Sequence, residues 1–447
     1  MNYKELAHDV IKKAKAKNID LAEAYVLWGN VTHIDILNQE IEASDILEDA
    51  GLGIRIVKDK KLGFSFSSEL DKTGIDEALS KAVSNSSQVK PDKFNTLPKP
   101  SQASSFPEIY DKEIKSIDIK EKIKIARSVE ESAYKFDKRI KKTEKVSYSD
   151  DEYEVIIVNS EGVDISYKGT SFEVMAQVIA EEEGLLEAGY GVDATLWFKD
   201  LDPKKAGEEA AQRAVELLGA KGAGSQKIPL VLDPFIGAEL LAALSSMLSS
   251  ESTQKGKSLL AGKIGKKISS PNVSIIDDGK LKNGIASGPY DAEGVPTRET
   301  PIIENGTLSS YLYNIYTANK DRVKSTGNAR RYSYKTLPIV SPSNIYIKNG
   351  NTSPDEIIKS TKKGFYVTKV MGMHTVNPIS GEFSIGASGI LIENGIKTIP
   401  VRGITISGNL IELLRSIEAV GSDLRFIPFG ANIGSPTLLI SGITISG

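Results

Sequence analysis

Cysteine is absent from this chain, and histidine is nearly so, with only His8, His33 and His374 among 447 residues. Disulfides, cysteine nucleophiles, cysteine-ligated zinc and iron–sulfur clusters all need thiolate sulfur, so the sequence excludes each of them. A chain of this size without disulfides fits a reducing compartment, and we expect a cytoplasmic protein.

Long hydrophobic runs are also missing. The longest apolar-leaning segment, residues 236–248, is interrupted by Glu239 and several serines, and it falls short of the roughly 20 residues that span a bilayer. The first 20 residues predict an amphipathic surface helix and lack the apolar stretch of a signal peptide. Charge is balanced, with 56 Lys and Arg against 59 Asp and Glu. We therefore expect neither a membrane nor a nucleic acid as a partner.

The order of the patterns predicts an α+β fold in which a mixed helix and antiparallel-sheet region precedes a β-rich C-terminal domain. Alternating apolar and polar residues over 24–68 predict an antiparallel meander, and helical spacing follows at 71–88. Further helices are predicted at about 119–134 and 204–220. We expect an N-terminal domain at 1–90, a middle helix and hairpin domain at 91–224 that could form one unit with the first, and a C-terminal domain at 225–447.

The C-terminal domain is predicted to begin with a short strand at 227–233 and a helix at 234–248, and then to consist almost entirely of strands and turns from residue 268. Asn305-Gly306 and Asn394-Gly395 each separate apolar runs, which is the strongest short signal for a hairpin. The hexapeptide GITISG occurs at 403–408 and again at 442–447. Its surroundings favour two similar β-strands over a structural repeat.

Four carboxylates fall close together in the sequence, at Asp277, Asp278, Asp291 and Glu293. Oxygen ligands of this kind could hold a hard cation or share a proton. Asp-Asp-Gly and Asp-x-Glu-Gly are also common in turns, where the short side chains bond to their own backbone. We favour the turn interpretation.

Residues 325–334 are the other group of polar residues with possible chemistry, and they include Asn328, Arg330 and Arg331. Arginine forks suit carboxylates and phosphates, whereas a charged turn paired with neighbouring acids is the simpler interpretation. His374 lies in a predicted loop, and one histidine without further ligands is weak evidence for a metal. We treat Asn328, Arg330, Arg331 and His374 as candidates for a peptide groove or an interface.

Long blocks of the sequence resemble the TldD/PmbA family, also known as TldD/TldE and as modulators of DNA gyrase. The blocks are DAEGVPTRETPIIENGTLSSYLYNIYTANK, STGNARR, NPISGEFSIGASGILIENG and GNLIELLRSIEAVGSDL. The resemblance covers most of the chain and implies that the β-rich C-terminal domain is metallopeptidase-like. TldD-type members of the family carry His-Glu-x-x-x-His on a helix and a downstream cysteine, which together bind zinc.

The resemblance places the zinc motif at Leu241, Ala242 and Ser246, none of which is a ligand, and the cysteine between residues 423 and 436, where no cysteine occurs. We therefore expect no metal and no cofactor in this chain. The segments SIGASG and STGNARR resemble those of the PmbA (TldE) type, the paralogue that pairs with the zinc-bearing subunit.

The resemblance implies a non-catalytic PmbA/TldE-type subunit of a heteromeric TldD/TldE zinc peptidase that acts on unfolded peptides. Its partners would be a TldD-type catalytic paralogue, which holds the zinc, and the peptide substrate. One alternative is a homo-oligomeric peptide-binding scaffold, with a second copy of the chain as its partner. A role with DNA gyrase rests on the family label alone, and the acidic pI near 5.9 opposes it. An enzyme that uses the carboxylates at 277–293 is a further alternative.

Overall fold

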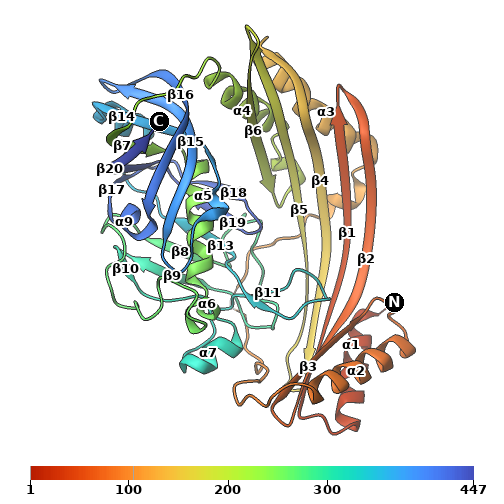
Figure 1. Ribbon diagram of the computed structural model, residues 1–447. Coiled ribbons are helices and arrows are strands. Elements are labelled where there is room, and N and C mark those ends of the chain that lie inside the picture. The colour runs from red at the N-terminus through yellow and green to blue at the C-terminus, as the bar shows by residue number, and fades with distance from the viewer. Residues whose placement is uncertain (1, 104) are drawn as a thin grey trace.

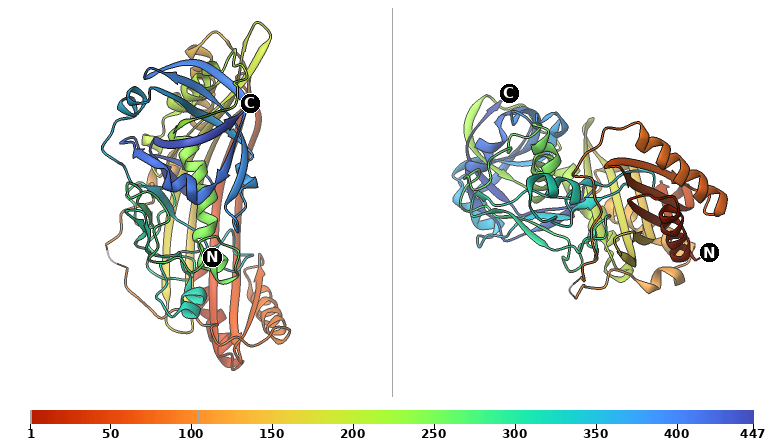
Figure 2. Two further views of the ribbon diagram at one scale, coloured as in Figure 1. Left: turned by 60° about the vertical axis from the view of Figure 1, so that its left-hand side comes forward. Right: turned by 90° about the horizontal axis from the view of Figure 1, so that it is seen from below.

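The structure is a computed structural model that describes residues 2–103 and 105–447. Two parts stand side by side, one built on a long antiparallel sheet and the other on two mixed sheets from the C-terminal half (Figure 1). Viewed from below, they form two lobes (Figure 2). Helices combine with antiparallel and mixed sheets, so the predicted α+β class with a β-rich C-terminal portion is confirmed.

One antiparallel sheet, here called the long sheet, takes strands from both sides of residue 91. Its order is β3-β2-β1-β4-β5-β6, so β1 lies between β2 of its own hairpin and β4 from beyond the proline-rich loop. The antiparallel meander predicted at 24–68 is confirmed, and it consists of β1, β2 and β3. The bounds are β1 Leu21–Leu37, β2 Glu40–Lys58, β3 Lys61–Ser67, β4 Ile140–Asn159, β5 Asp164–Glu182 and β6 Leu185–Thr195.

Helices cover one face of the long sheet, because its strands alternate between apolar and polar positions. Ala24, Val26 and Ile156 are fully or almost fully buried in a core that they share with the first two helices. The helices are α1 Tyr3–Ala16, α2 Lys72–Ser87, α3 Ile119–Phe136 and α4 Pro203–Glu216, with the short helices η1 Lys112–Ser116 and η2 Phe198–Asp200. The helices predicted from periodicity are confirmed here.

The C-terminal half folds into two larger mixed sheets and a two-stranded ribbon. In one sheet, β16-β15-β14-β7-β20-β17, strand β16 also pairs with β20, so five strands close into a ring. Both copies of GITISG lie in this contact, with Ile406 opposite Ile445, which confirms the strand interpretation. The bounds are β7 Gln226–Leu232, β14 Lys363–Met371, β15 Glu382–Glu393, β16 Ile396–Asn409, β17 Ile417–Val420 and β20 Leu438–Ser446.

The other mixed sheet has the order β10-β9-β8-β13-β19-β18, and the ribbon joins β11 to β12. The bounds are β8 Ile275–Asp278, β9 Glu299–Glu304, β10 Thr307–Leu308, β11 Ala329–Arg330, β12 Ile339–Val340, β13 Asn344–Ile347, β18 Arg425–Pro428 and β19 Asn432–Ser435. Figure 1 shows the segment around β11 reaching from the C-terminal half to the long sheet.

The helix α5, Pro234–Ser245, is the central helix of the C-terminal half, and its apolar residues join the largest core of the molecule. Short helices also occur where we predicted almost only strands and turns, because capping boxes at Asn314 and Ser353 start α7 and α8 without any long periodic pattern. The bounds are η3 Ser246–Leu248, α6 Ser250–Gln254, α7 Ile315–Asp321, α8 Pro354–Ser360, η4 Met373–Thr375 and α9 Leu410–Arg415. None of the helices in residues 2–103 and 105–447 is long and apolar enough to cross a membrane.

Candidate functional site

A cleft of about 510 Å³ lies between the long sheet and the C-terminal half, and we call it the interdomain cleft. The long sheet contributes odd-numbered residues of β1, β4 and β5, because alternate residues of a strand point to the same face. These are Tyr25, Leu27, Asp151, Tyr153, Val155, Tyr167, Ser171 and Glu173. The even-numbered neighbours face the helices, so one alternation in the sequence builds a core on one side of the sheet and a cleft wall on the other.

Loops of the C-terminal half form the opposite wall of the cleft, at residues 285–292, 327–331 and 428–432. Arg330 lines the cleft and donates a hydrogen bond to the carbonyl oxygen of Ala286 at 2.6 Å. It makes no ion pair with any residue of the described chain. Most of its five guanidinium donors are therefore available to a molecule in the cleft.

A buried ion network joins the two halves at the edge of the cleft. Arg55 of β2 donates to Glu23 of β1 at 2.5 Å and to Glu293 at 2.6 Å, and Arg331 donates to the other oxygen of Glu23. The four side chains are between 0% and 7% exposed. Burial alone would lower the pKa of Arg55, but the charges of Glu23 and Glu293 raise it above its usual value. The network fixes the cleft walls relative to each other.

For Arg331 the structure supports pairing with a neighbouring acid over a binding role. Its guanidinium is fully buried, pairs with Glu23 and lies 4.5 Å from the ring centre of Tyr25. It borders the cleft but has few donors left for a ligand. Asn328 is buried and does not line the cleft, and its side chain donates to Asp277 at 2.6 Å. His374 is exposed on η4 and does not line the cleft.

The turn interpretation of the carboxylates is confirmed for Asp291. One of its oxygens accepts the backbone N–H groups of Glu293 and Val295, both at 2.9 Å, and the other accepts that of Ala329 at 3.1 Å. Burial, followed by the charge of Glu293, raises the pKa of Asp291. Asp277 differs, because it accepts the N–H and the hydroxyl of Ser343, 66 positions away, and so joins two distant segments instead of forming a turn. These acids shape the loops of the cleft wall.

Sequence reasoning missed Glu23 and Arg55, which are central to the network. The signal was present, because each is a charged residue at a buried position of an apolar strand, in LAEAYV and GIRIV. Charges are almost never fully buried without a partner. Two such charges in neighbouring strands therefore indicate an ion pair.

Comparison with known proteins extends over almost the whole chain. Models of domain 1, the central domain and the C-terminal domain of the PmbA/TldA metallopeptidases match residues 22–86, 112–218 and 225–447. The chain belongs to the PmbA/TldD family. A Metalloprotease TldD homolog from Haemophilus influenzae is 30% identical over 96% of this chain and 94% of its own length. The Metalloprotease PmbA of Escherichia coli O157:H7 is 28% identical over 99% and 97%.

The solved structure of a protein described as a modulator of a DNA gyrase, from Thermotoga maritima, superposes with a TM-score of 0.91 at 30% identity, and it covers all of both chains. The PmbA/TldD fold is therefore present at full length. The identity of this chain to a relative named TldD, 30%, is nearly equal to its identity to a relative named PmbA, 28%, so overall identity does not distinguish the two types.

The three residues that the resemblance assigns to the zinc motif do not have side chains that bind zinc. Leu241 is 1% exposed and lies in the apolar core, and Ala242 has only a methyl side chain. Ser246 is exposed at the end of α5. Residues 423–436 contain no sulfur and place Phe429 against Phe235 of α5, with ring centres 5.3 Å apart. Across residues 2–103 and 105–447, no three His, Cys, Asp or Glu side chains gather as a metal group. The two segments that resemblance assigns to the metal thus meet through apolar contacts.

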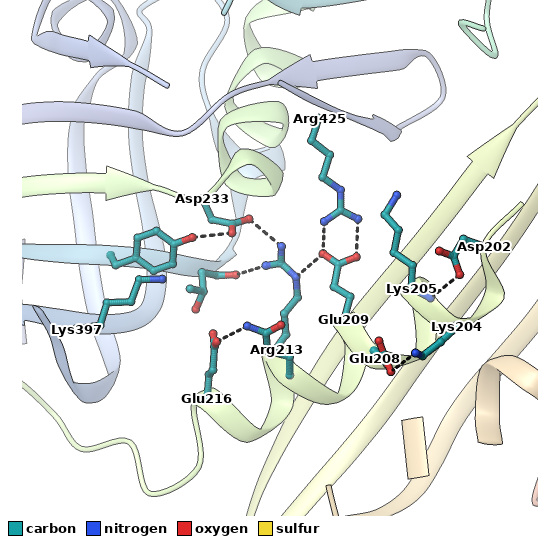
Figure 3. Close-up of a pocket in the computed structure, with 13 residues that line it drawn as sticks. Asp202, Lys204, Lys205, Glu208, Glu209, Arg213, Glu216, Asp233, Lys397 and Arg425 are labelled. Atoms are coloured by element: carbon teal, nitrogen blue, oxygen red, sulfur yellow. Dashed lines mark hydrogen bonds and ion pairs between the residues drawn. The ribbon is translucent and has the colours of Figure 1, made fainter. Parts of the chain in front are cut away.

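A second cavity between the halves, of about 480 Å³, is bordered by a charged seam of side chains between α4 and the C-terminal sheets (Figure 3). Arg213 of α4 donates to Asp233 at 2.8 Å and to Glu209 at 2.9 Å, and Arg425 of β18 binds both oxygens of Glu209. Asp233 also accepts the N–H of Phe235 and so caps α5. This seam fixes α5 relative to the long sheet.

Proposed function

We propose that this chain is a non-catalytic, PmbA/TldE-type subunit of a heteromeric zinc peptidase, and that a TldD-type paralogue supplies the zinc. The proposal is carried by the segment that the resemblance assigns to the zinc motif, where Leu241 and Ala242 of α5 and Ser246, just beyond its end, offer no zinc ligand. Zinc catalysis needs three protein ligands and an open position for water. The chain has no cysteine and no histidine between residues 34 and 373.

The role that remains for such a subunit is to bind and enclose the substrate, which we propose to be an unfolded peptide. The interdomain cleft supports this role, because tyrosines, backbone groups and Arg330 line it. Tyrosine offers an apolar ring with a polar tip, and arginine offers several donors to the carbonyl groups of an extended chain. Neither kind of contact depends on a particular peptide sequence.

The proposal is tested by mixing the purified chain with a TldD-type paralogue from the same organism and following cleavage of an unfolded, fluorogenic peptide. We expect the mixture to cleave the peptide, and a chelator to abolish the activity, since the partner's zinc performs the chemistry. The chain alone is expected to be inactive with or without added zinc. Zinc-dependent cleavage by the chain alone, or an inactive mixture, would refute the proposal.

Arg330 provides a second test, directed at the cleft. The substitution Arg330→Gln removes a charged donor and should raise the KM or Kd for the peptide by about tenfold or more, since a hydrogen bond to a charged group contributes about 1.5–3 kcal/mol. Arg330→Lys should retain part of the affinity. The matched control is Arg415→Gln, because Arg415 is exposed and also donates to a single backbone carbonyl, that of Lys267. Equal effects at the two positions would exclude Arg330 from peptide binding.

A further inference from the structure

A third cavity, of about 340 Å³, lies where α5 faces the long sheet, and we call it the α5 pocket. It shares Arg213 and Thr368 with the cavity of Figure 3 and opens beside the charged seam. Strands β5, β6 and β14 and helices α4 and α5 contribute to its walls. The lining residues that matter here are Tyr190, Phe235, Glu239, Thr368, Lys369 and Phe429.

Aromatic rings form much of the wall of the α5 pocket. The ring centre of Phe235 lies 5.7 Å from that of Tyr190 and 5.3 Å from that of Phe429, and both pairs meet edge to face. The guanidinium carbon of Arg213 lies over the ring of Phe235, 5.1 Å from its centre, so a cation already contacts this cluster of rings. Aromatic faces carry a negative quadrupole that attracts cations. Such a wall accepts an apolar stem with a cationic end.

The carboxylate of Glu239 is the one negative charge among the residues that line the α5 pocket. It is half-buried and makes no hydrogen bond or ion pair with the described residues. The nearest opposite charge is Arg213, which is already committed to Asp233 and Glu209. Burial raises the pKa of Glu239 to about 7, and Arg213 opposes this shift only in part. A half-buried carboxylate without a counter-ion is costly, and an incoming cation would relieve that cost.

A second polar atom in the wall is also unsatisfied. The Oγ1 atom of Thr368 is buried and has no hydrogen-bond partner in the described part of the chain. Buried hydroxyl groups almost always have a partner, so this one points to a ligand or to water. The neighbouring Lys369 donates at 3.5 Å to the carbonyl oxygen of Ala188, which holds its ammonium group away from Glu239.

We propose that the α5 pocket binds a primary ammonium group carried on an apolar stem, the chemistry of a lysine side chain. Glu239 is the counter-ion, Thr368 accepts a hydrogen bond from the ammonium, and the three aromatic rings contact the stem. The volume lies near the lower end of the roughly 300–1,000 Å³ usual for small-molecule sites. A metal ion fits less well, because one carboxylate and one hydroxyl do not make a coordination shell.

The direct test uses N-acetyl-lysine N-methylamide as the probe and the intact chain alone, so its outcome is independent of any zinc-bearing partner. Binding is followed by NMR titration or calorimetry. The neutral norleucine analogue should bind at least about tenfold more weakly, because it lacks the charge that Glu239 attracts.

Glu239→Gln keeps the shape of the side chain and removes its charge, so it should lower the affinity for the lysine probe to that of norleucine. The control is Glu208→Gln on α4, where the carboxylate is paired with Lys204 on the surface. Thermal unfolding of each variant confirms that the fold is intact. Unchanged lysine binding in Glu239→Gln, or tighter binding of N-acetyl-glutamate N-methylamide than of the lysine probe, would overturn the proposal.

The pH dependence gives an independent readout. Between pH 6 and pH 8 the ionised fraction of a carboxyl group with a pKa near 7 rises roughly tenfold, so the affinity for the lysine probe should rise by about that factor. The Glu239→Gln variant should show no such rise. The other titratable or charged groups on elements packed against α5 or lining the pocket are basic residues, tyrosines and one histidine: Arg213, Tyr190, Lys227, Tyr346, Lys363, Tyr366, Lys369, Arg425 and His374. Histidine is the only residue type among these that ordinarily changes charge between pH 6 and pH 8. His374 is exposed and lies outside the pocket. Retention of the pH dependence in His374→Gln therefore assigns it to Glu239.

Discussion

Replacement of Glu23 by glutamine is expected to destabilise the protein by about 3–5 kcal/mol, which is the usual loss when one partner of a buried ion pair is removed. Glu23 is the only carboxylate that Arg331 contacts by ion pair in the described chain, and it is one of two that contact Arg55. Its loss leaves Arg331 fully buried with an uncompensated charge. A neutral amide can accept a hydrogen bond but cannot balance two guanidinium groups.

The measurement is the urea or thermal midpoint, followed by circular dichroism. The control is Glu77→Gln on α2, which removes an exposed ion pair with Lys81 and should leave the midpoint unchanged. If Glu23→Gln fails to accumulate, the double variant Glu23→Met with Arg331→Met tests the same point, because an apolar pair of similar volume should restore much of the lost stability. A midpoint for Glu23→Gln equal to that of the control would contradict the structural role of the network.

Much of the local structure could be predicted because its causes lie close together in the sequence. The helix at 119–136 follows from apolar spacing and from Asp118, whose side chain accepts the N–H of Glu121. Hairpins at Asn305-Gly306 and Asn394-Gly395 follow from residues that tolerate positive φ, and the structure shows such values at all four positions. The family, too, could be recognised from contiguous blocks.

The site depends on contacts between distant residues, and these could not be predicted. Glu23 and Arg331 are 308 positions apart, and Glu209 and Arg425 are 216 apart. Each residue alone reads as an ordinary surface charge or as part of a strand. The domain boundaries stay a prediction, in which residues 91–224 could form one unit with residues 1–90. In the structure, β1 of the first region pairs with β4 of the second within one sheet. The α5 pocket likewise combines residues of β6, α5 and the segment near 429, which no local pattern brings together.

The second large effect is expected at Gly189 of β6, where the long sheet and α4 approach most closely. A Cβ atom at this position would lie 2.0 Å from the backbone oxygen of Ala210 and 2.5 Å from the backbone nitrogen of Ala214. Neither atom can move without displacing the helix. A Cβ atom at Gly191 would lie 2.1 Å from the backbone oxygen of Ala206. The two glycines, two positions apart on the strand, therefore pack against alanines four positions apart on the helix.

Gly189→Val should therefore destabilise the protein by about 3 kcal/mol or more, since overpacking against a rigid backbone cannot be relieved by a change of rotamer. The displaced helix also carries Arg213, whose guanidinium must reach Asp233 within 2.8 Å to keep α5 in place. The midpoint of thermal unfolding measures the first effect, and weaker binding of the lysine probe to the α5 pocket measures the second. Gly222→Val is the control, because an added Cβ there meets no atom within 4 Å and should change neither quantity. A Gly189→Val protein as stable as this control would show that α4 can shift away from β6 at little cost, and the charged seam would then be too loose to fix α5.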